Sequence, residues 1–222
     1  GETAVPKIVC LTFDDGPSAH TPEILDILEK EHVPATFFVC AQDANEAHLD
    51  KIADIAAAGH QIALHSATHQ YSKIYASTDA FWQDMKALRQ ALEQAGAGQI
   101  RIFAKIESLA GVQALPEFLP LVDEVVIARG DLGNAMPLWE LPRCQKQLSA
   151  VCRSAGVPFM VVTQMLDSMC SRAVPTRAEV SDIYNAVADG ASSVMLTGET
   201  AAGQYPVEAM EYLVRTARTA LE

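Results

Sequence analysis

Seven short apolar runs recur along the chain, and amphipathic segments separate them. The runs read KIVCLTF, ATFFVC, QIALHS, IRIFAKIE, EVVIARG, PFMVVTQ and SVMLTGE. Most of them are almost continuously apolar, which is typical of parallel strands that are covered on both faces. The chain therefore consists of βα units in series. This pattern predicts an α/β fold in the form of a closed parallel (β/α) barrel, similar to a TIM barrel, with seven or eight strands.

The length of the chain fits one such domain. Its 222 residues lie within the roughly 200–250 residues of many undivided α/β barrels. We therefore expect a single domain over residues 1–222. An open doubly wound sheet is the alternative, but the sequence favours it less, because no apolar run is followed by a G-x-G-x-x-G turn.

Capping signals mark several of the expected helices. Thr21 can cap a helix that has Pro22 at its first position, and Gly96 can end the helix before it. Thr176 and Glu179 have the spacing of a capping box, in which each side chain bonds the backbone of the other residue. These signals indicate helices between the apolar runs, as a βα series requires.

The formal net charge of −12 restricts the partners of the chain. Negative charge repels the phosphates of nucleic acids and anionic membranes, so we expect neither as a partner. No apolar run approaches the roughly 18 residues of a membrane span, and no signal peptide is visible. We expect a soluble, cytoplasmic protein with a small-molecule or sugar ligand, either monomeric or a swapped homodimer.

Five cysteines form no C-x-x-C pair. Cys10 and Cys40 lie within apolar runs, as buried residues do. We expect free thiols in the core and a reducing compartment.

The polar residues that follow the apolar runs are the candidates for function, because the active site of a (β/α) barrel lies at the carboxyl ends of its strands. After the first run, TFDDGPS brings two carboxylates together at Asp14 and Asp15. After the third run, HSATH holds His65 and His69 four residues apart. An aspartate with two histidines can bind a borderline metal and leave positions open for water. A lone H-x-x-x-H would be a surface coincidence, but its pairing with TFDDGPS favours a metal site.

Residues 7–96 resemble the polysaccharide deacetylase family through TFDDGPS and HSATH. The resemblance implies that Asp14 is the general base that activates water. It also implies that Asp15, His65 and His69 bind a divalent metal such as zinc or cobalt, which polarises an acetyl carbonyl. The family's late histidine, a general acid, has no counterpart, since no histidine follows His69.

The second half places a different set of polar residues at its strand ends. Glu107 and Asp131 follow neighbouring runs and form an oxygen-rich site suited to Mg²⁺ or Mn²⁺. Lys105 supplies positive charge beside them, where developing negative charge needs it. Lys105 and Glu107 could equally form a simple ion pair.

From Ile100 onward the chain resembles the barrel of pyruvate kinase. The matching stretches are IFAKIES, ARGDLG, TQMLDSM, PTRAEVSD and VMLTGETAAGQYPVEAM. The resemblance implies that Lys105 stabilises the enolate, that Glu107 and Asp131 bind the divalent ion, and that Thr163 lies in the proton-transfer region. It also implies that the backbone around Arg129 and Gly130 contacts the substrate carboxylate. The family's early-strand arginine, its potassium ligands and its further domains have no counterpart here.

The two resemblances meet between Gly96 and Gln99. This suggests a deacetylase-derived half, residues 1–97, and a pyruvate-kinase-derived half, residues 98–222. We therefore interpret the chain as an engineered chimeric barrel, a scaffold without efficient native activity that retains divalent-metal binding. The alternatives are a weak metal-dependent deacetylase or esterase, and residual pyruvate-kinase-like enolate chemistry. A natural gene fusion is a further alternative.

Overall fold

The computed structural model describes residues 11–41, 47–74, 76–97 and 100–222. The chain divides into two compact units, Gly1–Phe103 and Ala104–Glu222, and the division falls inside the fourth strand. Each unit is described separately below. The start of the first predicted strand and Cys10 lie outside the described residues.

The described residues contain seven strands that are arranged in the order of the chain. The α/β class is confirmed, and the parallel pairing of successive strands is consistent with a (β/α) barrel-like fold. The strands are β1 (Leu11–Gly16), β2 (Ala35–Cys40), β3 (Gln61–Ser66), β4 (Ile100–Ile106), β5 (Glu124–Ala128), β6 (Phe159–Val162) and β7 (Ser193–Met195).

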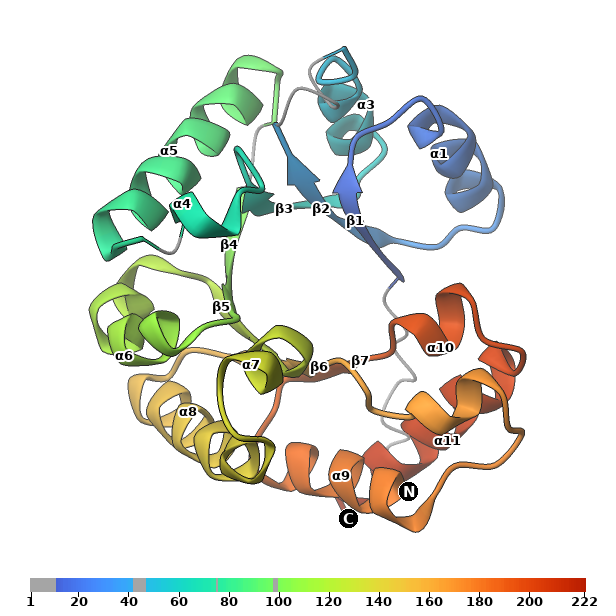
Figure 1. Cartoon of the computed structure of the whole chain (residues 1–222). Helices are drawn as coiled ribbons and strands as arrows, with labels where there is room; N and C mark the ends of the chain where they lie inside the picture. Colours follow the sequence, from blue (N-terminus) through green and yellow to red (C-terminus); the bar gives the residue numbers. More distant parts are fainter. Residues whose placement is uncertain (1–10, 42–46, 75, 98–99) are drawn as a thin grey trace. The chain divides into compact units, whose positions relative to one another are not determined.

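Helices connect the strands, as the amphipathic segments predict (Figure 1). In the first unit they are α1 (Thr21–Lys30), α3 (Lys51–Ala57), α4 (Tyr71–Ile74) and α5 (Thr78–Gln94). In the second unit they are α6 (Leu109–Phe118), α7 (Arg129–Ala135), α8 (Leu141–Ala155), α9 (Arg177–Ala188), α10 (Gly198–Ala201) and α11 (Pro206–Thr219). The second unit also has three short 3₁₀ turns, η1 (Leu119–Leu121), η2 (Leu138–Glu140) and η3 (Asp167–Cys170).

The core of the first unit lies between its strands and α1, α3 and α5 (Figure 1). Alternate residues of β2, Phe37 and Val39, belong to this core. Phe38 and Cys40 lie on the opposite face of the strand, because successive side chains of a strand alternate. Full burial of each large apolar side chain contributes about 1.5–3 kcal/mol. This packing fixes the position of β2, whose last residue is Cys40.

The core of the second unit surrounds β5 and β6. Every residue of these two strands is buried, and all of them except Glu124 are apolar, as expected of strands that are covered on both faces. The two strands pair in parallel, with Val125 opposite Phe159. Helices α7, α8, α9 and α11 each contribute buried side chains, among them Leu132, Leu148, Ile183 and Leu213.

The capping predictions are confirmed at two of three positions. Thr176 and Glu179 form a complete capping box at the start of α9. Gly96, with φ +94°, follows the end of α5 at Gln94. The prediction for Thr21 is wrong, because α1 already includes Thr21 and its hydroxyl accepts a bond from the Ser18 backbone at 2.9 Å.

Two further expectations concern the thiols and the membrane. As expected, the described cysteines form no disulfide bond; they are Cys40, Cys144, Cys152 and Cys170. Burial raises the pKa of Cys152 to about 11, as expected for an unreactive core thiol. Among the described residues, none of the helices has both the length and the apolar character that crossing a membrane demands.

Candidate functional sites

In the first unit, Asp15 occupies an irregularity between β1 and β2. Asp14 pairs with Phe38 and Gly16 pairs with Val39, so Asp15 is an extra residue in the ladder. It adopts a left-handed backbone conformation with φ +66°. An extra residue of this kind turns its side chain away from the regular strand direction, and such irregularities are common beside functional sites.

A second irregularity lies on the other side of β2. Val39 pairs with Leu64 and Cys40 pairs with Ser66, which makes His65 the extra residue of β3. The two strands that pair with β2, β1 and β3, therefore each carry an irregularity close to the carboxyl end of β2. The sequence gives no sign of either one, since a one-residue shift in pairing leaves the apolar runs unchanged.

The three predicted metal ligands lie together. Oδ1 of Asp15 is 3.1 Å from Nε2 of His65 and 3.6 Å from Nε2 of His69. The two imidazole rings are 5.0 Å apart. The side chain of His65 is 6% exposed and that of Asp15 is 57% exposed, so the cluster is buried on the histidine side and open on the aspartate side. Asp14, the predicted general base, is an exposed residue of β1.

Asp84, which holds the loop that carries His69, was not predicted from the sequence. Asp84 is a buried residue of α5, and its carboxylate accepts bonds from the backbone of Ala67 at 2.8 Å and of Thr68 at 3.1 Å. The hydroxyls of Ser66 and Thr68 also donate to it, at 2.9 and 2.8 Å. Ser66 Oγ in turn accepts a bond from the backbone of His69 at 2.7 Å, where φ is +52°. Asp84 therefore fixes the backbone that presents His69.

In the second unit, Lys105 and Glu107 lie at the end of β4. They are two residues apart and so share a face of the strand. Lys105 Nζ is 3.0 Å from Glu107 Oε1, and the carboxylate side chain is only 3% exposed. A buried carboxylate needs a cationic or hydrogen-bonding neighbour to remain ionised. The structure thus brings the predicted lysine and carboxylate together.

Asp131, the second predicted ligand of the divalent ion, is an exposed residue in the first turn of α7. Gly130, beside it, approaches Thr163 closely. A Cβ atom added to Gly130 would be 3.0 Å from Thr163 Cγ2. A glycine is therefore needed to leave space for the Thr163 side chain.

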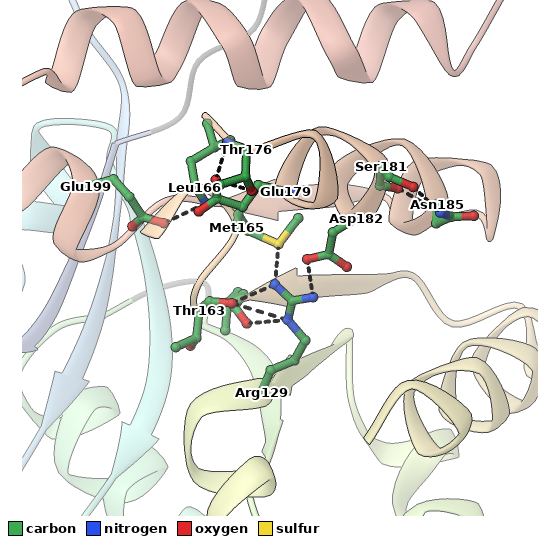
Figure 2. Close-up of polar contacts among 11 residues, drawn as sticks. Arg129, Thr163, Met165, Leu166, Thr176, Glu179, Ser181, Asp182, Asn185 and Glu199 are labelled. Atoms are coloured by element: carbon green, nitrogen blue, oxygen red, sulfur yellow. Dashed lines mark hydrogen bonds and ion pairs between the residues drawn. The ribbon is translucent and has the colours of Figure 1, made fainter. Parts of the chain in front are cut away.

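Arg129 holds the backbone of Thr163 (Figure 2). Its Nε and one terminal nitrogen donate to the Thr163 carbonyl at 3.2 and 2.7 Å. The other terminal nitrogen donates to Asp182 of α9 at 2.5 Å. Thr163 has φ +75°, an uncommon conformation for a β-branched residue, so the surrounding bonds have to stabilise it. The Arg129 side chain donates its hydrogen bonds to groups inside the protein. The predicted contact with the substrate carboxylate therefore falls to the Arg129 backbone.

Two glutamates hold the rest of the loop after β6. Glu199 is 1% exposed and accepts bonds from the backbone of Leu166 at 2.9 Å and of Thr197 at 2.8 Å. Glu179 accepts two bonds from Ser168, at 2.7 and 2.6 Å. It also accepts two bonds from Thr176 (Figure 2). Burial acts to raise the pKa of Glu179, but these hydrogen bonds outweigh it and hold the pKa below its ordinary value.

Comparison with known proteins identifies the family. A family model for the barrel domain of pyruvate kinase matches residues 41–210. The chain belongs to the pyruvate kinase family. It is 50% identical over 128 residues to pyruvate kinase of Geobacillus stearothermophilus, covering 58% of the chain and 22% of that protein. It is 46% identical over 147 residues to pyruvate kinase of Schizosaccharomyces pombe, covering 66% of the chain and 29% of that protein.

Membership of this family corrects the interpretation of the chain as an engineered scaffold. The pyruvate kinase match begins at residue 41 and continues across the predicted join at Gly96, so that interpretation is wrong. The deacetylase resemblance of residues 7–96 gains no support from these comparisons. The chain spans less than a third of the length of the curated relatives, 29% of pyruvate kinase from Clostridium acetobutylicum for example.

Proposed function

We propose that the second unit carries the enolate-stabilising site of a pyruvate kinase, with Mg²⁺ or Mn²⁺ bound by Glu107 and Asp131. The observation that carries this proposal is the ion pair of Lys105 with the buried Glu107 at the end of β4. The carboxylate oxygens suit a hard divalent cation. The bound cation would supply positive charge to the substrate oxygens. The ligand is then a small carboxylate such as pyruvate.

The remaining roles fall to residues of the chain. Lys105 stabilises negative charge on the enolate oxygen, because its ammonium lies in a partly buried position where charge interactions are strong. Thr163 lies at the methyl carbon of the enolate, where a proton is gained or lost. Backbone N–H groups at Arg129 and Gly130, in the first turn of α7, bind the substrate carboxylate, since the start of a helix attracts anions.

Exchange of the pyruvate methyl protons with deuterated water tests this function. It requires enolate formation alone, and therefore needs no nucleotide. With Mg²⁺ present we expect exchange in the full chain, and a loss on the order of 10²-fold or more in Lys105→Met. Lys146→Met, which removes an exposed lysine of α8, is the matched control and should retain the rate. Equal exchange in all three proteins would contradict the proposal.

A second candidate function is binding of zinc or cobalt by Asp15, His65 and His69 in the first unit. The distances of 3.1 and 3.6 Å from Asp15 Oδ1 to the two imidazoles support it. Titration of the chain with Zn²⁺ by calorimetry tests this function. We expect binding that His65→Ala abolishes and that His48→Ala, a change outside the cluster, preserves. Binding that survives His65→Ala would contradict it.

A further inference from the structure

The cluster around Asp15 contains a thiol that the three predicted ligands do not include. Cys40 is the last residue of β2, between the irregularities that hold Asp15 and His65. Its Sγ lies 4.0 Å from Asp15 Oδ1. One ligand atom each from Asp15, Cys40 and His65 lie within 4.8 Å of one another.

The spacing of these atoms approaches that of a metal shell. For zinc bonds of about 2.0–2.3 Å in a tetrahedron, neighbouring ligand atoms are about 3.2–3.8 Å apart. The three distances from Asp15 Oδ1, to His65, His69 and Cys40, are 3.1, 3.6 and 4.0 Å. The distances to His65 and His69 lie in or next to this range, and the distance to Cys40 is slightly longer.

We infer that Cys40 is a thiolate ligand in this site, which binds Zn²⁺ or a similar thiophilic cation through Asp15, Cys40 and His65. This inference rests on the proposed metal binding in the first unit. Sulfur selects soft cations over Mg²⁺ or Ca²⁺. The His69 imidazole, 3.6 Å from Asp15 Oδ1, is the candidate for the fourth position. With it bound, the tetrahedral shell leaves no position for a reactive water, as in a structural site.

The environment of each ligand agrees with this role. Cys40 is completely buried, and the His65 side chain is nearly so. A thiolate in that position needs a cation beside it, since an isolated buried charge is costly. Asp84 fixes the loop of His69 in advance through its bonds to Ala67 and Thr68, which lowers the entropic cost of closing the shell. Asp15, on the solvent side, leaves a route for the ion to enter.

Cobalt(II) reports directly on a sulfur ligand. A cobalt–thiolate bond gives an intense charge-transfer absorption in the near ultraviolet, and tetrahedral cobalt gives strong visible bands. We expect both when the full chain is titrated with CoCl₂, and we expect loss of the charge-transfer band in Cys40→Ser. Cys144→Ser, which changes a buried cysteine of α8, is the matched control and should retain it. Circular dichroism verifies that each variant is folded, and Cys40→Ala replaces Cys40→Ser if that variant is not.

Proton release supplies a second measurement. Binding of Zn²⁺ at neutral pH deprotonates the Cys40 thiol, and the proton passes to the solvent. The unchanged chain should therefore release about one proton more per zinc than Cys40→Ser, measured with a pH indicator in weak buffer. If Cys40→Ser binds cobalt with the same spectrum and releases the same protons, Cys40 is not a ligand, although metal binding stands. If neither protein binds cobalt, the proposed metal site itself fails.

Discussion

In two loops of this chain, charged side chains from helices hold the loop backbone, but the charges differ between the loops. The loop after β3, residues 66–69, and the loop after β6, residues 163–170, both contain residues with positive φ that are not glycine. Asp84 holds the first loop through four neutral donors. The second loop is held by Arg129 and two glutamates. In each case the buried charge comes from a helix outside the loop, so the helices fix the loop backbone as well as covering the strands.

The carboxylate of Asp84 accepts bonds from two backbone N–H groups and two hydroxyls, all of them neutral. In the second loop the Arg129 guanidinium donates to Asp182 and to the Thr163 carbonyl, while Glu179 and Glu199 accept bonds from backbone N–H groups of the same loop. The second loop therefore depends on charges of both signs, whereas the Asp84 bonds to the first loop pair one charge with neutral donors.

The strongest test of the comparison removes the cation of the second loop. Arg129→Met leaves Asp182 and the Thr163 carbonyl inside the protein without their donor. We expect a loss of about 3–5 kcal/mol in the free energy of unfolding, measured by urea denaturation. Arg143→Met removes an exposed arginine that pairs with Glu140 on the surface, and should cost less than about 1 kcal/mol. Equal losses would mean that Arg129 does not hold the loop.

Removing the charge of the first loop should have a smaller effect. In Asp84→Asn an amide nitrogen replaces one carboxylate oxygen and cannot accept from the donors that faced that oxygen, so we expect a loss of about 2–3 kcal/mol in stability. Zinc binding should weaken too, because the His69 backbone loses its support. Asp79→Asn, an exposed aspartate in the same helix, should cost about 0.3–1 kcal/mol and leave zinc binding unchanged. A normal zinc affinity in Asp84→Asn would show that Asp84 does not support the metal site.

These supporting residues mark the limit of what the sequence can predict. The strands, the capping box at Thr176 and the polar strand ends follow from local patterns, because period and spacing are local properties. Asp84, Asp182 and Cys40 were not predicted as parts of the sites. Arg129 and Asp182 are 53 positions apart, and no local pattern pairs them. The irregularities at Asp15 and His65 depend on strand register, which the apolar runs leave undetermined.

Substitution of two glycines of α7, Gly130 and Gly133, distinguishes an effect on the position of Thr163 from an effect on helix stability. In Gly130→Ala the new methyl group would meet Thr163 Cγ2 at 3.0 Å, so the threonine must shift. We expect slower proton exchange of pyruvate, by about tenfold, a change of about 1.4 kcal/mol in the barrier. Gly133→Ala meets Leu141 at an ordinary 3.4 Å, and should stabilise the helix by about 0.5–1 kcal/mol with an unchanged exchange rate. The same rate in both variants would show that Thr163 tolerates displacement.

The smallest expected effect is the pH dependence from Glu179. Burial opposes its charge, but the bonds from Ser168 and Thr176 prevail and lower its pKa in the folded state. A lowered pKa stabilises the fold above the unfolded-state pKa, and this contribution disappears as pH falls through the folded-state pKa. Glu179→Gln should therefore be less stable than the unchanged chain at neutral pH, with a difference that shrinks in acid. Urea midpoints across the acid range measure this, with the exposed Glu208→Gln of α11 as control. A difference that grows in acid would mean that the hydrogen bonds around Glu179 favour its protonated form. The two loops would then not both be held by an ionised carboxylate.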